Sequence, residues 1–261
     1  LPESLKVPTL IYNKEMVTSP PATTDELLSL MAQFNENNQY ALVYDVTNAY
    51  FSVAWFHGYD AYFLDPSTLD VALNTSGGVK AAELINEMRD YMPSDVNYDL
   101  MMALFTQKKA GMIINGPWAI ADIKNAGFDP ATNLGFALLP SVSGGGRAKP
   151  YMTIEGVYIT KNAVERGVFD AAWFFAYWLV TKGVVTMAKE AGHIPTYSPA
   201  AEDPTISSDP VILAFVNQSR YSVPIPNVPQ MSIIWSVVPT YLSAVWTGTM
   251  TPSVAMNTAQ K

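Results

Sequence analysis

The sequence has 261 residues, of which 49% are hydrophobic and 15% are charged, and its formal net charge is −8. This length is enough for two modest lobes or for one large α/β domain with its own core. No basic run is longer than Lys108-Lys109, which argues against a nucleic-acid partner, because phosphates are neutralised by clustered cations. The lack of cysteine excludes a disulfide framework and Cys-based zinc or redox sites.

The start of the chain carries no recognisable leader. It begins at Leu1, with neither Met nor a basic and apolar segment behind it. We therefore expect that a signal has been removed or that the chain is a piece of a longer protein.

The first elements are predicted from prolines, β-branched residues and a helix cap. Prolines make Pro2 to Pro8 extended, and Thr9 to Tyr12 is a short strand. Thr23 and Glu26 form a capping box ahead of a helix that continues to Phe34. Residues 40–44 form the next strand, and Gly77-Gly78 opens a helix that continues to Met88.

The segment 105–118 contains a change from helix to strand to helix. A helix ends near Lys108-Lys109, and Gly111 to Ile114 is an apolar run with the length of one buried strand. Gly116 can take positive φ, and Pro117 can begin a helix. In an open α/β sheet such a junction faces the ligand crevice, which places Trp118 at its mouth.

The second half of the chain contains one strand and several apolar helices. Residues 151–159 are predicted as a strand, and residues 143–147, rich in glycine, as a floppy surface loop. The longest apolar run, Ala171 to Val180, is half of a bilayer span and indicates a buried helix. Another helix, Trp235 to Val245, is expected to be interrupted at Pro239.

Three segments carry a family resemblance. Lys108 to Trp118 resembles the "K-x-A-M-x-x-x-G-P-W" segment of extracellular solute-binding proteins of sugar ABC importers, above all the maltose/maltodextrin-binding proteins. Pro224 to Trp235 is similar to their "M-P-N-x-P-Q-M-x-x-x-W" segment, and Gly248 to Ala255 to their "G-x-x-T-P-x-x-A" tail. The resemblance extends over nearly the whole chain, but it corresponds to the later two-thirds of a full binding protein.

The resemblance implies an α/β fold of the periplasmic-binding-protein type II class. Residues 1–8 would cross between lobes, and residues 9–150 with 205–261 would form the C-terminal lobe. Residues 151–204 would be a returning segment of the N-terminal lobe. Most of the N-terminal lobe would be absent from this sequence and would act as a partner. The helix around Phe169 to Val185 would then expose an apolar face in this chain alone, because it normally packs against strands of the absent part.

The same resemblance implies the ligand-binding residues. Tyr50 and Phe51 stand where the family has an aromatic pair that stacks on sugar rings, and Trp118 and Trp235 would add further aromatic surface. Lys6 and Asn48 occupy positions where the maltose-binding proteins usually have glutamates that accept hydrogen bonds from sugar hydroxyls. Tyr98 joins this set because it precedes the helix that leads into residues 105–118.

The implied function is to bind a maltodextrin-like oligosaccharide and deliver it to the membrane subunits of an ABC importer. The location would be periplasmic or extracellular, either free or tethered to the membrane, with no cofactor and no catalysis. A sugar-sensing or protein-interaction module derived from such a protein is the alternative. A glycosidase is the enzymatic alternative, because Asp45, Glu155 and Glu3 offer carboxylates for an acid pair.

The remaining candidates for chemistry have weak patterns. His57 and His193 are far apart in the sequence and match no metal-binding spacing, so we expect no metal site. The sequence also contains no G-x-S-x-G nucleophile segment.

Overall fold

The computed structural model describes residues 1–35, 37, 39–65 and 67–261. The strands are β1 (Pro2–Lys6), β2 (Thr9–Asn13), β3 (Tyr40–Val43), β4 (Ala110–Asn115), β5 (Leu134–Ala137), β6 (Tyr151–Gly156), β7 (Ile194–Pro195) and β8 (Val223–Pro224). The helices are α1 (Thr24–Asn35), α2 (Ala49–Gly58), α3 (Ser76–Met88), α4 (Tyr98–Thr106), α5 (Ile120–Asn125), α6 (Lys161–Glu165), α7 (Phe169–Trp178), α8 (Val184–Ala191), α9 (Pro204–Ser207), α10 (Pro210–Ser219), α11 (Met231–Trp246) and α12 (Pro252–Ala259).

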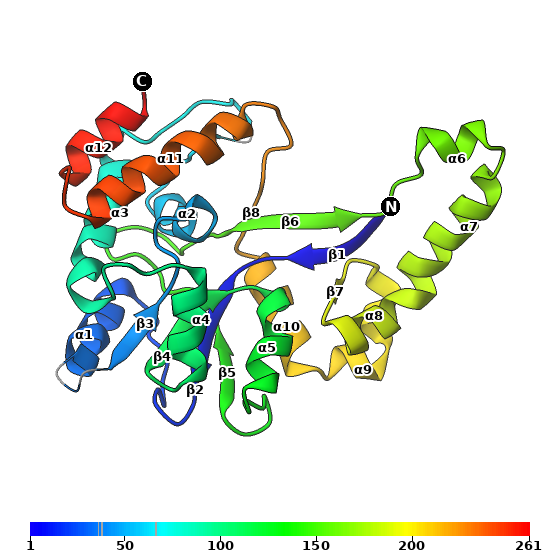
Figure 1. Ribbon diagram of the computed structural model, residues 1–261, viewed down its shortest axis with the longest axis horizontal. Coiled ribbons are helices and arrows are strands. Elements are labelled where there is room, and N and C mark those ends of the chain that lie inside the picture. The colour runs from blue at the N-terminus through cyan, green and yellow to red at the C-terminus, as the bar shows by residue number, and fades with distance from the viewer. Residues whose placement is uncertain (36, 38, 66) are drawn as a thin grey trace.

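The strands form two four-stranded sheets. One has the order β3-β4-β2-β5, with β3 parallel to β4 and the other pairs antiparallel. The other has the order β7-β1-β6-β8, in which β1 is antiparallel to both of its neighbours. The chain passes from one sheet to the other between Lys6 and Thr9, so β1 and β2 connect the two halves of the molecule (Figure 1).

Helices α2, α3, α11 and α12 gather at the end of the molecule that holds the C-terminus (Figure 1). Trp55 and Phe56 of α2 are fully buried there, and so is Leu242 of α11. The fully buried strand β4 lies between β3 and β2 in the first sheet. A strand buried on both faces has a continuous apolar sequence, as β4 does.

The predicted capping box at α1 is present with one change. The Glu26 amide donates to Thr23 Oγ1 at 3.3 Å, whereas Glu26 Oε2 accepts from the Ala22 amide at 2.7 Å rather than from the Thr23 amide. Both bonds satisfy amides at the helix start that have no intrahelical partner. This local chemistry explains why α1 begins where the sequence predicts.

The apolar run by itself predicts a buried helix at Ala171–Val180, which is wrong for this chain, whereas the exposed apolar face that the resemblance implies for residues 169–185 is present. Helices α6 and α7 project from the body as an arm (Figure 1), and large apolar side chains are exposed on it. They are Val164, Val168, Phe169, Trp173, Phe174, Phe175, Tyr177 and Trp178, and Tyr158, in the segment before α6, is exposed as well. Apolar composition indicates that a helix needs cover, but it does not say whether the same chain supplies that cover.

The helical segment Phe169–Ala191, which includes a π-helical turn at Leu179–Gly183, is 23 residues long. By length and composition alone it is able to cross a membrane, and 28% of its most apolar stretch is buried. One such segment is weak evidence, because core helices meet the same criteria, and we assign no membrane span from it.

Two further expectations need correction. Pro239 lies inside α11, which continues to Trp246 without interruption. The glycine-rich segment 143–147 is held in a turn, since Gly146 donates to the Gly58 carbonyl at 2.7 Å and accepts from the Val142 amide at 2.9 Å. Backbone bonds to α2, which the sequence does not reveal, replace the expected loose loop.

His57 is a fully buried histidine on α2. Its Nδ1 lies 2.7 Å from the Lys149 carbonyl, and Nε2 has no partner among the described residues. The ring packs against Tyr62 and Tyr151, with centroids 4.8 and 5.0 Å away, and the nearby Lys149 ammonium is paired with Asp60. Burial lowers the pKa of His57 to about 4, because the core disfavours the charged ring.

This lowered pKa predicts a loss of stability in acid. The His57 ring takes up a proton near pH 6.5 in the unfolded chain and near pH 4 in the folded chain. The contribution of neutral His57 to the free energy of unfolding is therefore fully present above pH 6.5 and is lost as the pH falls toward 4. Over that window the contribution is about 3 kcal/mol. Urea unfolding followed by circular dichroism should show a smaller decline for His57→Gln than for the unsubstituted chain. Parallel declines in the two proteins would contradict the assignment.

Candidate functional site

The N-terminus of α2 forms one part of the site. Asn48 caps the helix by accepting a hydrogen bond from the Tyr50 amide at 3.0 Å, and its Nδ2 donates to Asp45 Oδ2 at 3.4 Å. Burial raises the pKa of Asp45, and hydrogen bonds from Asn48 and Thr47 partly offset that effect. Asn48 therefore has a local role, as the cap of α2 and a partner of Asp45.

Tyr50 joins this helix end to Trp118. The two ring centroids are 6.1 Å apart, at an interplanar angle of 47°. The Tyr50 hydroxyl approaches the Thr153 side chain but is buried without a hydrogen-bond partner among the described residues. Burial accordingly raises the pKa of Tyr50 above its usual range. The Tyr50 hydroxyl is thus a polar atom without a partner within the site.

Trp118 lies in a 3₁₀ turn, Pro117–Ala119, that leads into α5. Gly116 has φ −106° and so does not use the positive φ that a glycine permits. The glycine is required for another reason: a Cβ atom at Gly116 would lie 2.1 Å from the Trp118 ring. Trp118 also lines a small hollow of about 160 Å³ that is bounded by α5, α8 and α10.

Phe51 and Tyr98 lie behind Tyr50. Phe51 is 4% exposed and its ring contacts Tyr50, with the centroids 5.7 Å apart. It also stacks on Tyr98 at 6.5 Å, and Asn115 Nδ2 is 3.5 Å from the Tyr98 hydroxyl. Phe51 is therefore placed to support Tyr50 rather than to offer its own face to a ligand.

Trp235 borders two open hollows. One, of about 520 Å³, is lined by Met152 to Ile154, Tyr158, residues 224–228 and Met231. The other, of about 380 Å³, is lined by Asp45, Thr47, Asn48, Ala49 and Pro239. Trp118 lines neither of these two hollows. The two tryptophans are connected through the α2 N-terminus, which borders the smaller hollow beside Trp235, and through Tyr50, which packs on Trp118.

Strand β6 carries the polar side chains of the site. The Tyr151 ring packs edge-on against Trp235 with centroids 5.9 Å apart, and Thr153 lines the larger hollow. Glu155 continues the same alternation along the strand, and Lys6 Nζ lies 2.6 Å from its Oε1. Thr153 and Lys6 are directly paired across β6 and β1. Alternate residues of a strand share one face, so these groups form a row.

Glu3 and His193 extend this row. His193 Nδ1 lies 2.8 and 3.0 Å from the two oxygens of Glu3, which is buried, and one atom each of Glu3, Glu155 and His193 lie within 4.8 Å of one another. Glu155 is paired with Lys6, and Glu3 is paired with His193. The separation of the Glu3 and Glu155 carboxylate oxygens, within 4.8 Å, approaches the roughly 5 Å between the two carboxyl groups of a retaining glycosidase. Glu3, however, is 6% exposed and faces His193 rather than an open groove.

Glu3 and Glu155 were candidates for an acid pair, but no sequence pattern places Lys6 and His193 beside them. The alternation of Tyr151, Thr153 and Glu155 was an available signal that β6 offers three side chains to one face.

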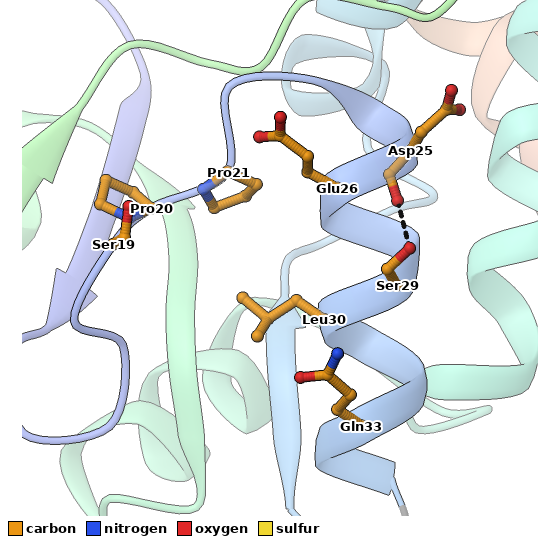
Figure 2. Close-up of a pocket in the computed structure, with 8 residues that line it drawn as sticks. All are labelled: Ser19, Pro20, Pro21, Asp25, Glu26, Ser29, Leu30 and Gln33. Atoms are coloured by element: carbon orange, nitrogen blue, oxygen red, sulfur yellow. Dashed lines mark hydrogen bonds between the residues drawn. The ribbon is translucent and has the colours of Figure 1, made fainter.

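A separate hollow of about 380 Å³ lies between the loop Ser19–Pro21 and α1 (Figure 2). It shares no lining residue with the hollows around Trp235, and within it Ser29 Oγ donates to the Asp25 carbonyl at 2.8 Å.

Solved structures have the same fold. A cyclo/maltodextrin-binding protein complexed with maltotetraose has a TM-score of 0.85 at 28% identity, over 99% of this chain and 68% of that chain. The maltose-maltodextrin binding protein of Alicyclobacillus acidocaldarius has a TM-score of 0.84 at 28% identity, over 99% of this chain and 69% of that one.

Curated relatives agree with the structures. The maltotriose-binding protein of Pyrococcus abyssi is 30% identical over 91% of this chain and 52% of its own length. The galactooligosaccharide-binding protein of Bacillus subtilis is 27% identical over 99% of this chain and 63% of its own length. The chain thus spans about half to two-thirds of the length of these relatives.

A family model described as bacterial extracellular solute-binding protein matches residues 4–214. That match includes β6, the α2 N-terminus and β1 from Ser4 onward, whereas Trp235 lies beyond it. The chain belongs to the family of bacterial extracellular solute-binding proteins.

Proposed function

We propose that this protein binds a neutral oligosaccharide of the maltodextrin or galactooligosaccharide type for an ABC importer. The observation that carries the proposal is the position of Trp235, between two open hollows and beside the polar row on β6. A sugar ring offers C–H groups to an aromatic face and hydroxyls to polar side chains, and this site presents both kinds of surface. The names of the relatives, for maltotriose and galactooligosaccharide, support this class of ligand.

Transport without catalysis fits the same site. Glu3 and Glu155 are held by His193 and Lys6, and Asp45 accepts from Asn48, so the three candidate carboxylates are engaged in local contacts. The proposed role is to bind sugar outside the cytoplasm, with the protein free or tethered to the membrane, and to deliver it to the importer's membrane subunits. The family's extracellular character and the lipoproteins of ABC transporters among the relatives support this location.

We further propose that the exposed arm packs against a segment that completes the N-terminal lobe. Residues 9–150 with 205–261 would then form the C-terminal lobe, residues 1–8 the crossing, and residues 151–204 the part of the other lobe that this chain contains. Two observations support this proposal: the apolar side chains on α6 and α7 lack cover, and the relatives are longer than this chain. The completed lobe would add the second wall of the cleft.

Trp235→Ala should weaken oligosaccharide binding. With one wall of the cleft we expect this chain to bind maltotriose in the millimolar range, and removing a central aromatic anchor should cost about 2 kcal/mol. Ligand-observed NMR at millimolar maltotriose measures the change. Trp178→Ala is the matched control, because Trp178 lies on the arm and stacks on Phe175. Equal maltotriose binding by Trp235→Ala and the unsubstituted chain would show that Trp235 is a packing residue.

The arm should bind an apolar dye. Fluorescence of 8-anilinonaphthalene-1-sulfonate should rise with this chain and fall in Phe174→Ser, since Phe174 is 72% exposed. Ile233→Ser, at a 60% exposed position on α11, is the control and should leave the signal unchanged. No dye binding by a monomeric chain would contradict an uncovered arm.

A further inference from the structure

The polar row on β6 changes from an aromatic side chain at one end to a carboxylate at the other. Its first side chain, Tyr151, contacts Trp235, and its second, Thr153, lines the larger hollow and approaches the Tyr50 hydroxyl. The third, Glu155, follows at the same two-residue spacing, about 6–7 Å further along the strand. The row therefore leads from the aromatic surface, through Thr153 in the larger hollow, to a carboxylate that lies one alternation beyond the residues lining that hollow.

Glu155 is ion-paired with Lys6, but its side chain stays partly exposed to solvent. Lys6 Nζ is 2.6 Å from Oε1, while 45% of the Glu155 side chain and 30% of the Lys6 side chain remain exposed. The two residues are diagonal neighbours on the paired strands, since Lys6 faces Thr153 and Ser4 faces Glu155. A carboxylate accepts several hydrogen bonds, so the contact with Lys6 leaves accepting capacity on Glu155.

We infer that Glu155, positioned by Lys6, accepts a hydrogen bond from a ligand hydroxyl and makes the site selective for neutral over acidic oligosaccharides. This inference rests on the proposed function. A hydroxyl donor gains a charge-assisted bond from Glu155 without disturbing Lys6. A uronic acid carboxylate would meet Glu155, with buried Glu3 close behind it, while the Lys6 charge is already engaged.

The experiment compares Glu155→Gln with Glu165→Gln in this chain. Glu165 forms an exposed ion pair with Lys161 on α6, so it is the same change of residue at an ion pair outside the site. The probes are maltotriose and trigalacturonic acid, whose dissociation constants are measured by ligand-observed NMR. Thermal unfolding of both variants establishes that the fold is kept.

Glu155→Gln should weaken maltotriose binding by about tenfold, the typical effect of losing a charge-assisted hydrogen bond. It should also create measurable binding of trigalacturonic acid, because Lys6 is released from its partner. Lys6→Met should weaken maltotriose binding without that gain, and Glu165→Gln should behave as the unsubstituted chain. A merely structural Glu155 would produce losses but no gain for the acidic sugar.

Two negative results have different meanings. If the unsubstituted chain binds no maltotriose and no neutral galactooligosaccharide, the proposed function fails and this inference fails with it. If the unsubstituted chain binds maltotriose, and Glu155→Gln has the same preference between the two probes, the role of Glu155 alone is overturned.

Discussion

The pairing of β1 with β6 is the constraint on which the site depends. It joins residues about 150 positions apart and fixes Lys6 opposite Thr153. Tyr151 at the start of β6 then meets Trp235, and Glu155 near its end meets Lys6. A slip of one residue in this register would turn the whole row to the other face of the sheet. Backbone hydrogen bonds within this chain therefore hold the polar half of the site.

Local sequence chemistry was sufficient for much of the fold. The Thr23 and Glu26 cap predicted α1, and the apolar run from Gly111 predicted β4, because both signals lie within a few residues. The family resemblance predicted the overall class of fold, which the similar solved structures share. The apolar run alone was misleading at the arm, whose large apolar side chains are exposed, and only the resemblance led to that exposure. The turn held by Gly58 was missed because a distant partner decides its conformation. Pro239 is a different case, since a local helix-breaking signal was overridden inside α11.

The resemblance supplied candidate residues for the site but not their arrangement. The resemblance indicated Tyr50, Trp118 and Trp235, yet the packing of Tyr50 on Trp118 and the separate hollows beside the two tryptophans follow from tertiary contacts. Asn48 was expected to face a ligand, and the structure shows its amide engaged in capping α2 and contacting Asp45. Lys6 was expected as a ligand contact, and its ion pair with Glu155 could not be predicted because it depends on strand register. The roles of these side chains in binding stay predictions.

The charge of the site follows from which strand supplies each group. Lys6 on β1 supplies one positive charge, while Glu155 on β6 and Glu3 at the start of β1 supply two negative charges. Pairing of β1 with β6 brings Glu155 beside Lys6, and the carboxylate balances the ammonium charge. Both side chains stay partly exposed, so the contact costs little desolvation free energy. The accepting oxygen is thus fixed before a ligand arrives, and its position costs no ordering on binding. A charged pair held by two strands is compatible with an open cleft, because its support comes from the sheet and not from the opposite wall.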